Sequence, residues 1–206
     1  MPDLKKAGKP LKEAKKVAIM IHGRGATATS ILDLQNYLHL EDFALLAPQA
    51  PGNTWYPYSF MAPDKENEPA FSQAIQAVSE LVKTANEAGF SSEQLYFFGF
   101  SQGACLALEY ASQNAQKYGG VIAFTGGLIG EEINEKKYQG DFEGTPVFIG
   151  SSHKDMHVPL SRIDASAKVI ERMGAKVKTM IFEDQQHTIR EEEVDWVNQH
   201  ILDQNQ

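Results

Sequence analysis

The chain has very little sulfur chemistry available, because Cys105 is the only cysteine among its 206 residues. A single thiol cannot close an internal disulfide or build a thiolate metal cluster, so a disulfide-stapled fold is excluded. Long apolar runs are also missing, and no segment suits a signal-peptide core or a membrane-spanning helix. These absences favour a reducing compartment, and we expect a cytoplasmic protein without stable membrane insertion.

Positive charge is scarce as well, with 19 Lys and Arg against 27 Asp and Glu and a net charge of −8. This balance works against binding to nucleic acid or to an anionic membrane and favours small or neutral substrates. The early part of the chain is nevertheless rich in lysine: Lys5, Lys6, Lys9, Lys12, Lys15 and Lys16. We interpret this run as a solvated N-terminal segment rather than an electrostatic docking arm.

Short apolar runs alternate with longer segments of helical period, which is typical of an α/β fold with a mostly parallel sheet. Most of these runs are nearly continuous in hydrophobicity, as in strands covered by helices on both faces. The predicted strands are Val17–Ile21, Phe43–Ala47, Leu95–Phe98, Val121–Phe124, Val147–Ile149 and Val177–Phe182. We expect residues 1–206 to form a single domain without a separate cap domain.

Three helices are predicted with their ends. Phe71, Ile75, Val78 and Val82 recur at helical spacing, and Gly89 is suited to end that helix. A second helix starts at a capping-box-like pair, Ser161 and Asp164, and ends at Gly174. The last helix carries Ile189, Val194, Val197 and Ile201.

Two segments of about twenty residues lack any regular pattern, which in a compact domain usually indicates binding loops or lids. They run from Pro48 to Pro69 and from Thr125 to Pro146. We expect both to border a functional site. The first contains the aromatic stretch 55–61, which either lines a pocket for an acyl or aryl group or only covers the sheet edge.

The most specific motif is Gly99-Phe100-Ser101-Gln102-Gly103, a G-x-S-x-G sequence between a predicted strand and a predicted helix. In this context the serine lies on a strained turn, and the glycines let strand and helix approach closely. The motif therefore predicts Ser101 as a nucleophile. Cys105, one helical turn later, is predicted to be a packing residue.

A serine hydroxyl needs a histidine base and a carboxylate that orients the histidine. His187 follows the last predicted strand and Asp155 follows the strand before it, which matches the chain order Ser, acid, His of this kind of fold. Carboxyl ends of parallel strands meet at one edge of the sheet, so the three residues can converge.

Other residues compete for these roles. His153 and His157 are rival bases, but they lie on the loop that should carry the acid, whereas His39 and His200 are predicted on helix surfaces. Glu183 and Asp184 are rival acids that lie too close to His187 in sequence to be favoured.

Acyl transfer also requires donors for the developing oxyanion. One is predicted to be the backbone N–H of Gln102, and the other the backbone N–H of Arg24 in the loop after the first predicted strand. The same loop also matches a dinucleotide fingerprint, Gly23-x-Gly25-x-x-Ala28. The match is weak, because the acidic residues about twenty positions later, Glu41 and Asp42, precede the second strand instead of ending it.

Together, the oxyanion loop at residues 22–26, the serine motif, the segment 155–159 and His187 resemble the α/β-hydrolase superfamily. Within it they are most similar to the phospholipase/carboxylesterase family, which includes small bacterial carboxylesterases and acyl-protein thioesterases. The resemblance implies an α/β-hydrolase fold and a serine hydrolase without metal or organic cofactor. The resemblance implies the triad Ser101, Asp155 and His187 and the backbone donors Arg24 and Gln102. We also expect substrate to be bound by His22, Gly23, Trp55 and Tyr56.

The resemblance predicts cleavage of carboxylic esters or thioesters with small or acyl groups. We also expect that the protein can form a homodimer. Lysophospholipase or thioesterase action on long acyl chains is the alternative, and a non-catalytic ligand-binding protein is the alternative of another class. Arg24 departs from the aliphatic residue general in eukaryotic thioesterases. Its side chain either pairs with a substrate carboxylate or phosphate or extends into solvent.

Overall fold

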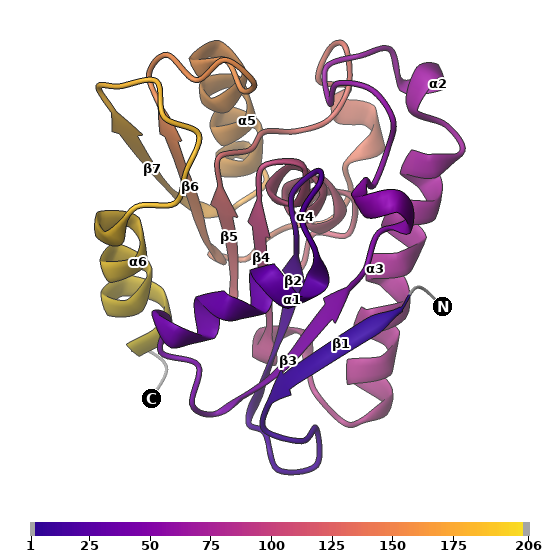
Figure 1. Cartoon of the computed structure of the whole chain (residues 1–206), viewed down its shortest axis with the longest axis vertical. Helices are drawn as coiled ribbons and strands as arrows, with labels where there is room; N and C mark the ends of the chain where they lie inside the picture. Colours follow the sequence, from indigo (N-terminus) through magenta and orange to yellow (C-terminus); the bar gives the residue numbers. More distant parts are fainter. Residues whose placement is uncertain (1–2, 204–206) are drawn as a thin grey trace.

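The computed structural model describes residues 3–203, and their strands form one seven-stranded sheet (Figure 1). The strands are β1 (Leu4–Gly8), β2 (Lys16–Ile21), β3 (Phe43–Pro48), β4 (Leu95–Phe100), β5 (Gly120–Phe124), β6 (Pro146–Ser152) and β7 (Lys176–Phe182). Their order across the sheet is β1-β3-β2-β4-β5-β6-β7. Only β1 runs antiparallel to its neighbour among these strands, so the predicted, mostly parallel α/β-hydrolase sheet is confirmed.

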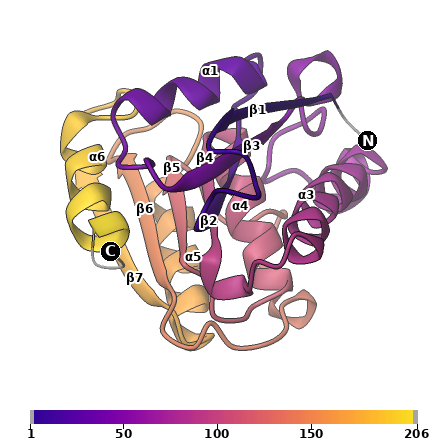
Figure 2. The same ribbon diagram turned by 90° about the horizontal axis from the view of Figure 1, so that it is seen from below.

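Helices cover both faces of the sheet (Figure 2). They are α1 (Ala28–Leu32), α2 (Asp64–Asn67), α3 (Ala70–Glu87), α4 (Gln102–Gln113), α5 (Leu160–Arg172) and α6 (Glu191–Val197), which continues as a π-helical turn over Asn198–Leu202. Short 3₁₀ turns lie at Asp33–Asn36, Pro51–Asn53, Ser92–Gln94 and Glu135–Lys137. Helices α1 and α6 pack on one face, and α3, α4 and α5 pack on the other.

The apolar core explains why the strands were visible in the sequence. In β2, Val17, Ile19 and Ile21 face the α3–α5 side, whereas Ala18 and Met20 face the α1 and α6 side. A strand buried on both faces cannot alternate with polar residues, so it reads as a continuous apolar run. All six predicted strands are present, with ends that differ by at most a few residues.

The lysine-rich segment differs from its prediction. Instead of a solvated lead-in, residues 4–8 form β1, whose backbone pairs with β3. Leu4 and Ala7 pack partly against the core, while Lys5 and Lys6 remain exposed. Backbone pairing needs no apolar side chains, which is why the charge pattern did not reveal the strand. Lysines on an edge strand also oppose pairing with another chain.

The helix ends were partly predicted. Gly89 and Gly174 follow α3 and α5 as expected, and both adopt positive φ angles, +97° and +88°. The predicted capping box at Ser161 is wrong, because α5 begins one residue earlier and has no side-chain cap. Pro159, with φ −61° and ψ 139°, instead directs the chain into the helix.

Glycines allow the first turn of α4 to approach the ends of β2 and β4 closely. A Cβ atom on Gly103, in the first turn of α4, would lie 2.0 Å from the Ile21 carbonyl oxygen. A Cβ on Gly99 would lie 2.3 Å from the Gly103 oxygen. The turn between β4 and α4 therefore exists in this form only because both positions lack a side chain.

A charged cluster anchors the loop between β7 and α6. Arg190 donates from Nη2 to Ser152 Oγ at 2.7 Å and to Asp184 Oδ1 at 2.6 Å. Its backbone N–H donates to Glu193 Oε2 at 2.7 Å. Glu193 is fully buried, and this burial raises its pKa to about 7 despite the nearby Arg190 guanidinium. The cluster joins the ends of β6 and β7 to the start of α6.

We expect Gly103→Ala to lower the free energy of unfolding by about 3 kcal/mol, because the new methyl group overlaps the Ile21 carbonyl. Gly52→Ala is the comparison variant, since a Cβ on Gly52 would have no neighbour within 4 Å, although its φ of +58° strains an alanine, whereas Gly103 lies in α4 without a positive φ. Its cost should be about 1 kcal/mol, from the backbone alone. Urea unfolding of both variants measures the difference, and equal losses would contradict the close-packing explanation.

Glu193 should make the protein less stable as the pH rises. Its pKa in the folded state, about 7, lies above its ordinary value of 4.5, so the native state holds the proton more tightly than the unfolded state. The resulting penalty is absent below about pH 4.5 and reaches about 3 kcal/mol above pH 7. Glu193→Gln removes the ionisation but keeps an oxygen for the Arg190 N–H.

The measurement is urea unfolding of wild type and Glu193→Gln across this pH range. The difference in unfolding free energy, variant minus wild type, should rise by about 2–3 kcal/mol between about pH 5 and pH 8. A difference that does not change with pH would show that Glu193 keeps an ordinary pKa.

Candidate active site

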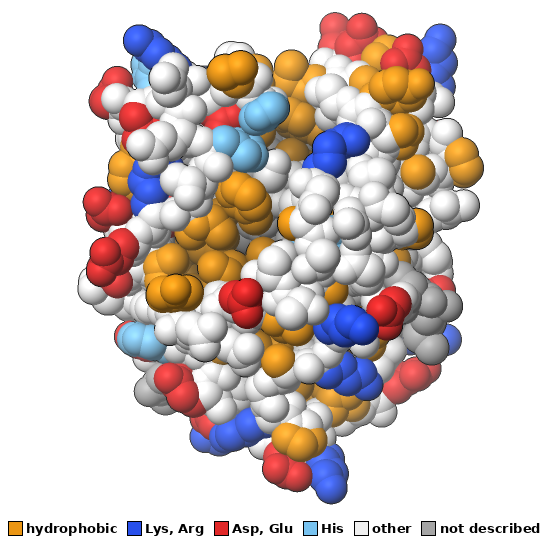
Figure 3. Space-filling model, viewed as in Figure 1, with side chains coloured by type: hydrophobic (Ala, Val, Ile, Leu, Met, Phe, Trp, Pro, Cys, Tyr) orange, Lys and Arg blue, Asp and Glu red, His pale blue; other side chains and the backbone are white. Residues whose placement is uncertain are grey.

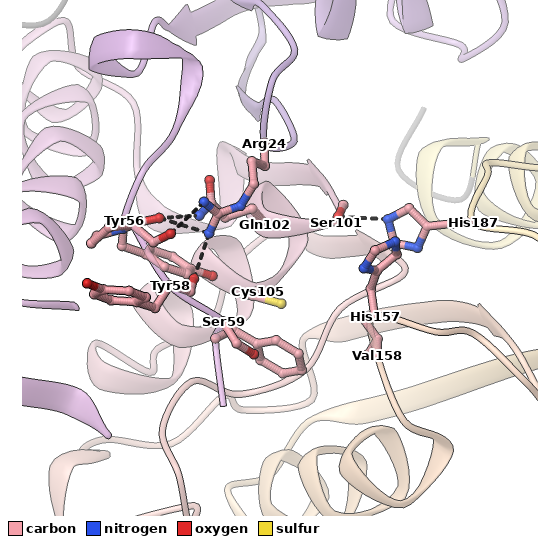
Figure 4. A pocket seen from close by; sticks show the side chains of 12 residues that line it. Arg24, Tyr56, Tyr58, Ser59, Ser101, Gln102, Cys105, His157, Val158 and His187 are labelled. Carbon is pink, nitrogen blue, oxygen red and sulfur yellow. Dashed lines mark hydrogen bonds between the residues drawn. The ribbon is translucent and has the colours of Figure 1, made fainter. Parts of the chain in front are cut away.

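Ser101, His187 and Asp155 form a continuous hydrogen-bonded chain, although they come from three different loops. The Ser101 Oγ lies 2.8 Å from His187 Nε2 (Figure 4), and His187 Nδ1 lies 2.7 Å from Asp155 Oδ2. Ser101 follows β4, Asp155 follows β6 and His187 follows β7. Because these strands are parallel, all three loops lie at the same edge of the sheet.

The backbone at Ser101 is strained. Its φ of +54° and ψ of −119° are unusual for a residue with a side chain. The Ser101 N–H donates to the Phe124 carbonyl at 3.0 Å, and its own carbonyl accepts from Cys105 N at 3.0 Å. These bonds hold the strand–turn–helix arrangement that the sequence motif predicts, with the hydroxyl directed at the histidine.

Asp155 is held as an ionised acceptor. Burial raises its pKa, but hydrogen bonds from His187 and from the backbone N–H groups of His157 and Val158 outweigh this and leave the pKa below its ordinary value. The two backbone bonds measure 2.7 and 2.9 Å. A carboxylate can only accept, so His187 carries its proton on Nδ1 and presents an unprotonated Nε2 to Ser101.

The rival residues lie elsewhere. The imidazole of His153 is paired with Glu183 at 3.6 Å on the surface, and Asp184 is bound by Arg190. His157 borders the cleft with its ring centroid 4.9 Å from that of His187, but its backbone N–H is what binds Asp155.

Two further histidines, His39 and His200, are peripheral to this site. His200 stacks on Trp196 in the final helical turn. The expectation that His39 lies on a helix is wrong: it lies in the loop before β3, where Nδ1 is 2.9 Å from Asp203. The chain leaves its 3₁₀ turn at Asn36, which places His39 beyond the helical segment.

The side chains of Arg24 and Gln102 both bind the aromatic loop after β3. Gln102 Oε1 accepts from Trp55 N at 2.9 Å, and Nε2 donates to the Tyr56 carbonyl at 2.8 Å. Arg24 donates to the carbonyls of Tyr56, Pro57 and Tyr58 at 2.9, 2.8 and 2.6 Å (Figure 4). The Arg24 guanidinium is therefore bound to this loop instead of extending freely into solvent, and its pairing with a substrate carboxylate or phosphate stays a prediction.

A cleft of about 410 Å³ opens beside Ser101. It is lined by Arg24, Tyr56, Pro57, Tyr58, Ser59, Phe60, Ser101, Gln102, Cys105, His157, Val158 and His187. Figure 3 shows histidine side chains next to hydrophobic side chains at the surface near the carboxyl ends of the central strands. The loop 48–69 borders this cleft as expected. The loop 125–146 does not: it packs behind α4, where Ile129 N donates to Glu109.

Three of the four predicted substrate-binding residues do not line the cleft. His22 is fully buried, with Nδ1 donating to the Gly23 carbonyl and Nε2 accepting from Ala50 N. Burial also lowers its pKa. Trp55 is buried and donates from Nε1 to the His22 carbonyl at 2.8 Å. The hydrogen bonds of His22 to Ala50 and Trp55 hold the start of the loop 22–26 in place, and of the four residues only Tyr56 reaches the cleft.

Cys105 was not assigned to the site from the sequence, whereas lining a pocket was one of two interpretations of the stretch 55–61, which contains residues 58–60. The Cys105 side chain is buried at the cleft wall, and burial raises its pKa to about 12, so it stays a neutral thiol. Its position one helical turn after Ser101 was a signal that it lies near the nucleophile. For Ser59 and Phe60, nothing in the sequence indicated whether their side chains line the cleft or only cover the edge of the sheet.

The dinucleotide fingerprint lacks its acidic partner in space. Asp42 lies at the start of β3, opposite the end of the sheet where the Gly23–Gly25 loop lies, and it is bound by Lys9 and Lys15. Among residues 3–203, no three His, Cys, Asp or Glu side chains gather in an arrangement suited to a metal ion.

Several known proteins are similar to this chain. A phospholipase/carboxylesterase from Dyadobacter fermentans is 49% identical, with a TM-score of 0.97 over 98% of this chain and 97% of that one. Acyl-protein thioesterase 1 of Saccharomyces cerevisiae is 28% identical over 73% of this chain and 74% of its own length. A carboxylesterase from Mesorhizobium loti shares the fold at 18% identity, with a TM-score of 0.71 over 91% of this chain and 88% of that one.

Within the described part of the chain, no helix is both long and apolar enough to cross a membrane. The family description Phospholipase/Carboxylesterase matches residues 5–204, which is nearly the whole chain. The chain therefore belongs to the phospholipase/carboxylesterase family and is a hydrolase of the carboxylesterase or acyl-protein thioesterase type.

Proposed function

We propose that this protein cleaves carboxylic esters or thioesters with Ser101 as nucleophile, His187 as general base and Asp155 as the residue that orients His187. The observation that carries the proposal is the unbroken hydrogen-bonded chain of these three side chains beside an open cleft. The ionised Asp155 supports it, because a carboxylate acceptor keeps the imidazole in the tautomer that a general base requires.

The reaction proceeds in two steps. As Ser101 Oγ attacks the substrate carbonyl, its proton passes to His187 Nε2, and the tetrahedral intermediate carries a negative oxygen. The backbone N–H groups of Arg24 and Gln102 are proposed to bind that oxygen. His187 then protonates the leaving alcohol or thiol, and the acyl-enzyme forms.

Water completes the cycle. His187 takes a proton from water, the resulting hydroxide equivalent attacks the acyl-enzyme, and Ser101 regains its proton as the acid leaves. Apart from water and the substrate, these proton transfers involve only groups of this chain. Cys105 does not compete as a nucleophile, because its raised pKa keeps the thiol protonated.

The shape of the cleft favours substrates with a short acyl group. Its wall at residues 56–60 is closed by the hydrogen bonds of Arg24 and Gln102, and Val158 and Phe60 contribute apolar surface. Action on thioesters of longer acyl chains is a second candidate, favoured by the similarity to the yeast acyl-protein thioesterase. Rates on p-nitrophenyl esters from acetate to palmitate separate the two.

Ser101→Ala should lower the hydrolysis of p-nitrophenyl acetate by about 10⁴-fold or more and abolish labelling by a fluorophosphonate probe. Ser161→Ala, at an exposed position of α5, is the matched control and should keep both. Undiminished activity in Ser101→Ala would refute the proposed nucleophile. Absence of both activity and labelling in the wild type would favour a non-catalytic ligand-binding protein.

Asp155→Asn should reduce kcat by roughly 10³–10⁴-fold, because an amide can stabilise the wrong tautomer of His187. The control is Glu183→Gln, which removes an exposed rival carboxylate near His187 in sequence. It should change kcat by less than about twofold. Kinetics of both variants on p-nitrophenyl acetate test the assignment of Asp155. A larger loss of kcat in Glu183→Gln than in Asp155→Asn would show that Glu183, and not Asp155, orients His187.

A further inference from the structure

The aromatic loop after β3 separates two hollows. On one side lies the cleft at Ser101, and on the other an apolar groove of about 580 Å³ over α3. The groove is lined by Pro51, Thr54, Trp55, Tyr56, Pro57, Ala70, Gln73, Ala74 and Ala77. Tyr56 and Pro57 line both hollows. We call residues 56–58 the partition.

The partition depends on side chains for its hydrogen bonds. Within residues 3–203, no backbone N–H donates to the carbonyls of Tyr56, Pro57 or Tyr58. Arg24 donates to all three, and Gln102 Nε2 and Thr54 Oγ1 donate to the Tyr56 carbonyl at 2.8 and 3.0 Å. Arg24 is thus the only described side chain that donates to the Pro57 carbonyl and the Tyr58 carbonyl. Removing it would leave both carbonyls without a protein donor.

The charged guanidinium of Arg24 bonds the carbonyls of the partition and forms no ion pair with a described carboxylate. No described carboxylate lies within 4.0 Å of its guanidinium, so the three carbonyls are its protein partners instead of an ion pair. Hydrogen bonds from a charged donor are stronger than neutral ones, and three from one planar group restrain the position of a short segment. Figure 4 shows the guanidinium reaching across the cleft toward Tyr56 and Tyr58.

We propose that the Arg24 side chain determines substrate chain length by holding the partition closed between the cleft and the α3 groove. The inference rests on the proposed hydrolase function. With the partition closed, an acyl chain ends against Tyr56 and Pro57. Without the guanidinium, a longer chain extends past them into the groove, whose alanine-rich lining over α3 matches an alkyl chain.

The test compares kcat/KM for p-nitrophenyl acetate and p-nitrophenyl octanoate in wild type and Arg24→Leu. The ratio of octanoate to acetate should rise by about tenfold or more in Arg24→Leu, because several methylenes gain an apolar site. Arg24→Lys keeps the charge but loses the planar set of donors, and should shift the ratio less in the same direction. This second variant provides the readout if Arg24→Leu does not fold.

A groove-filling variant makes the test specific. Gln73 is exposed on α3 and lines the groove but not the cleft, so Gln73→Trp alone should leave the wild-type ratio unchanged. Combined with Arg24→Leu, it should cancel most of the gain on octanoate. An unchanged ratio in the Arg24 variants, an equal loss on both esters, or a gain that survives Gln73→Trp would each overturn the proposal.

Failure of the proposed function is distinguishable from failure of this inference. If Ser101→Ala hydrolyses both esters like the wild type, the nucleophile assignment itself is wrong. If Ser101→Ala is inactive on both esters and the Arg24 variants keep the wild-type ratio, the hydrolase assignment stands and only the role of Arg24 falls.

Discussion

The close approach of α4 to the end of β2 is the constraint on which the site depends. Gly103 lies against the Ile21 carbonyl, so the first turn of α4 reaches the loop that carries Arg24. The same approach forces the chain through the strained backbone of Ser101. A side chain at Gly99 or Gly103 would separate these elements, and the serine, Gln102 and the Arg24 loop would no longer share one edge of the sheet. The strain at Ser101 is offset by the packing of a large buried sheet around it.

The other half of the site depends on polar contacts between loops. His187 and Asp155 lie in the loops beyond β7 and β6, where the Phe100 ring packs against His187. Hydrogen bonds of charged groups also hold these loops: Asp155 accepts two backbone N–H groups, and Arg190 bridges Ser152 and Asp184. Burying Arg190 and Glu193 costs stability, which is visible in the raised pKa of Glu193. The result is a histidine with a defined position and tautomer.

The substrate cleft joins these two halves. Arg24 and Gln102 have backbone positions beside Ser101, yet their side chains bind the aromatic loop. One pair of residues therefore connects the proposed oxyanion donors to one wall of the cleft. The coupling consists of hydrogen bonds from the side chains of the same two residues. This coupling gives a reason for an arginine where an aliphatic residue could fill the same space.

Local patterns in the sequence determined the parallel sheet, the serine turn and the order of the triad residues. Buried parallel strands read as apolar runs, and the G-x-S-x-G motif has a specific backbone requirement at Ser101. The strand β1 was not predicted, because it forms through backbone hydrogen bonds to β3 and backbone groups are the same in every sequence. Asp155 and His187 were predictable from strand order and from what a serine nucleophile requires, whereas the distances of their hydrogen bonds come from the tertiary structure.

Tertiary structure alone decided which side chains face the substrate. His22 and Trp55 lie in the expected loops, yet their side chains are buried away from the cleft, whereas Phe60 and His157 line it. The Arg24 side chain binds carbonyls 32 to 34 residues away in the chain. Such contacts depend on how two loops pack against each other, and the pattern of apolar residues along the chain does not predict that packing. The sequence by itself therefore determined the fold and the order of the proposed catalytic residues, and only the packing of loops over the sheet edge decided the shape of the cleft.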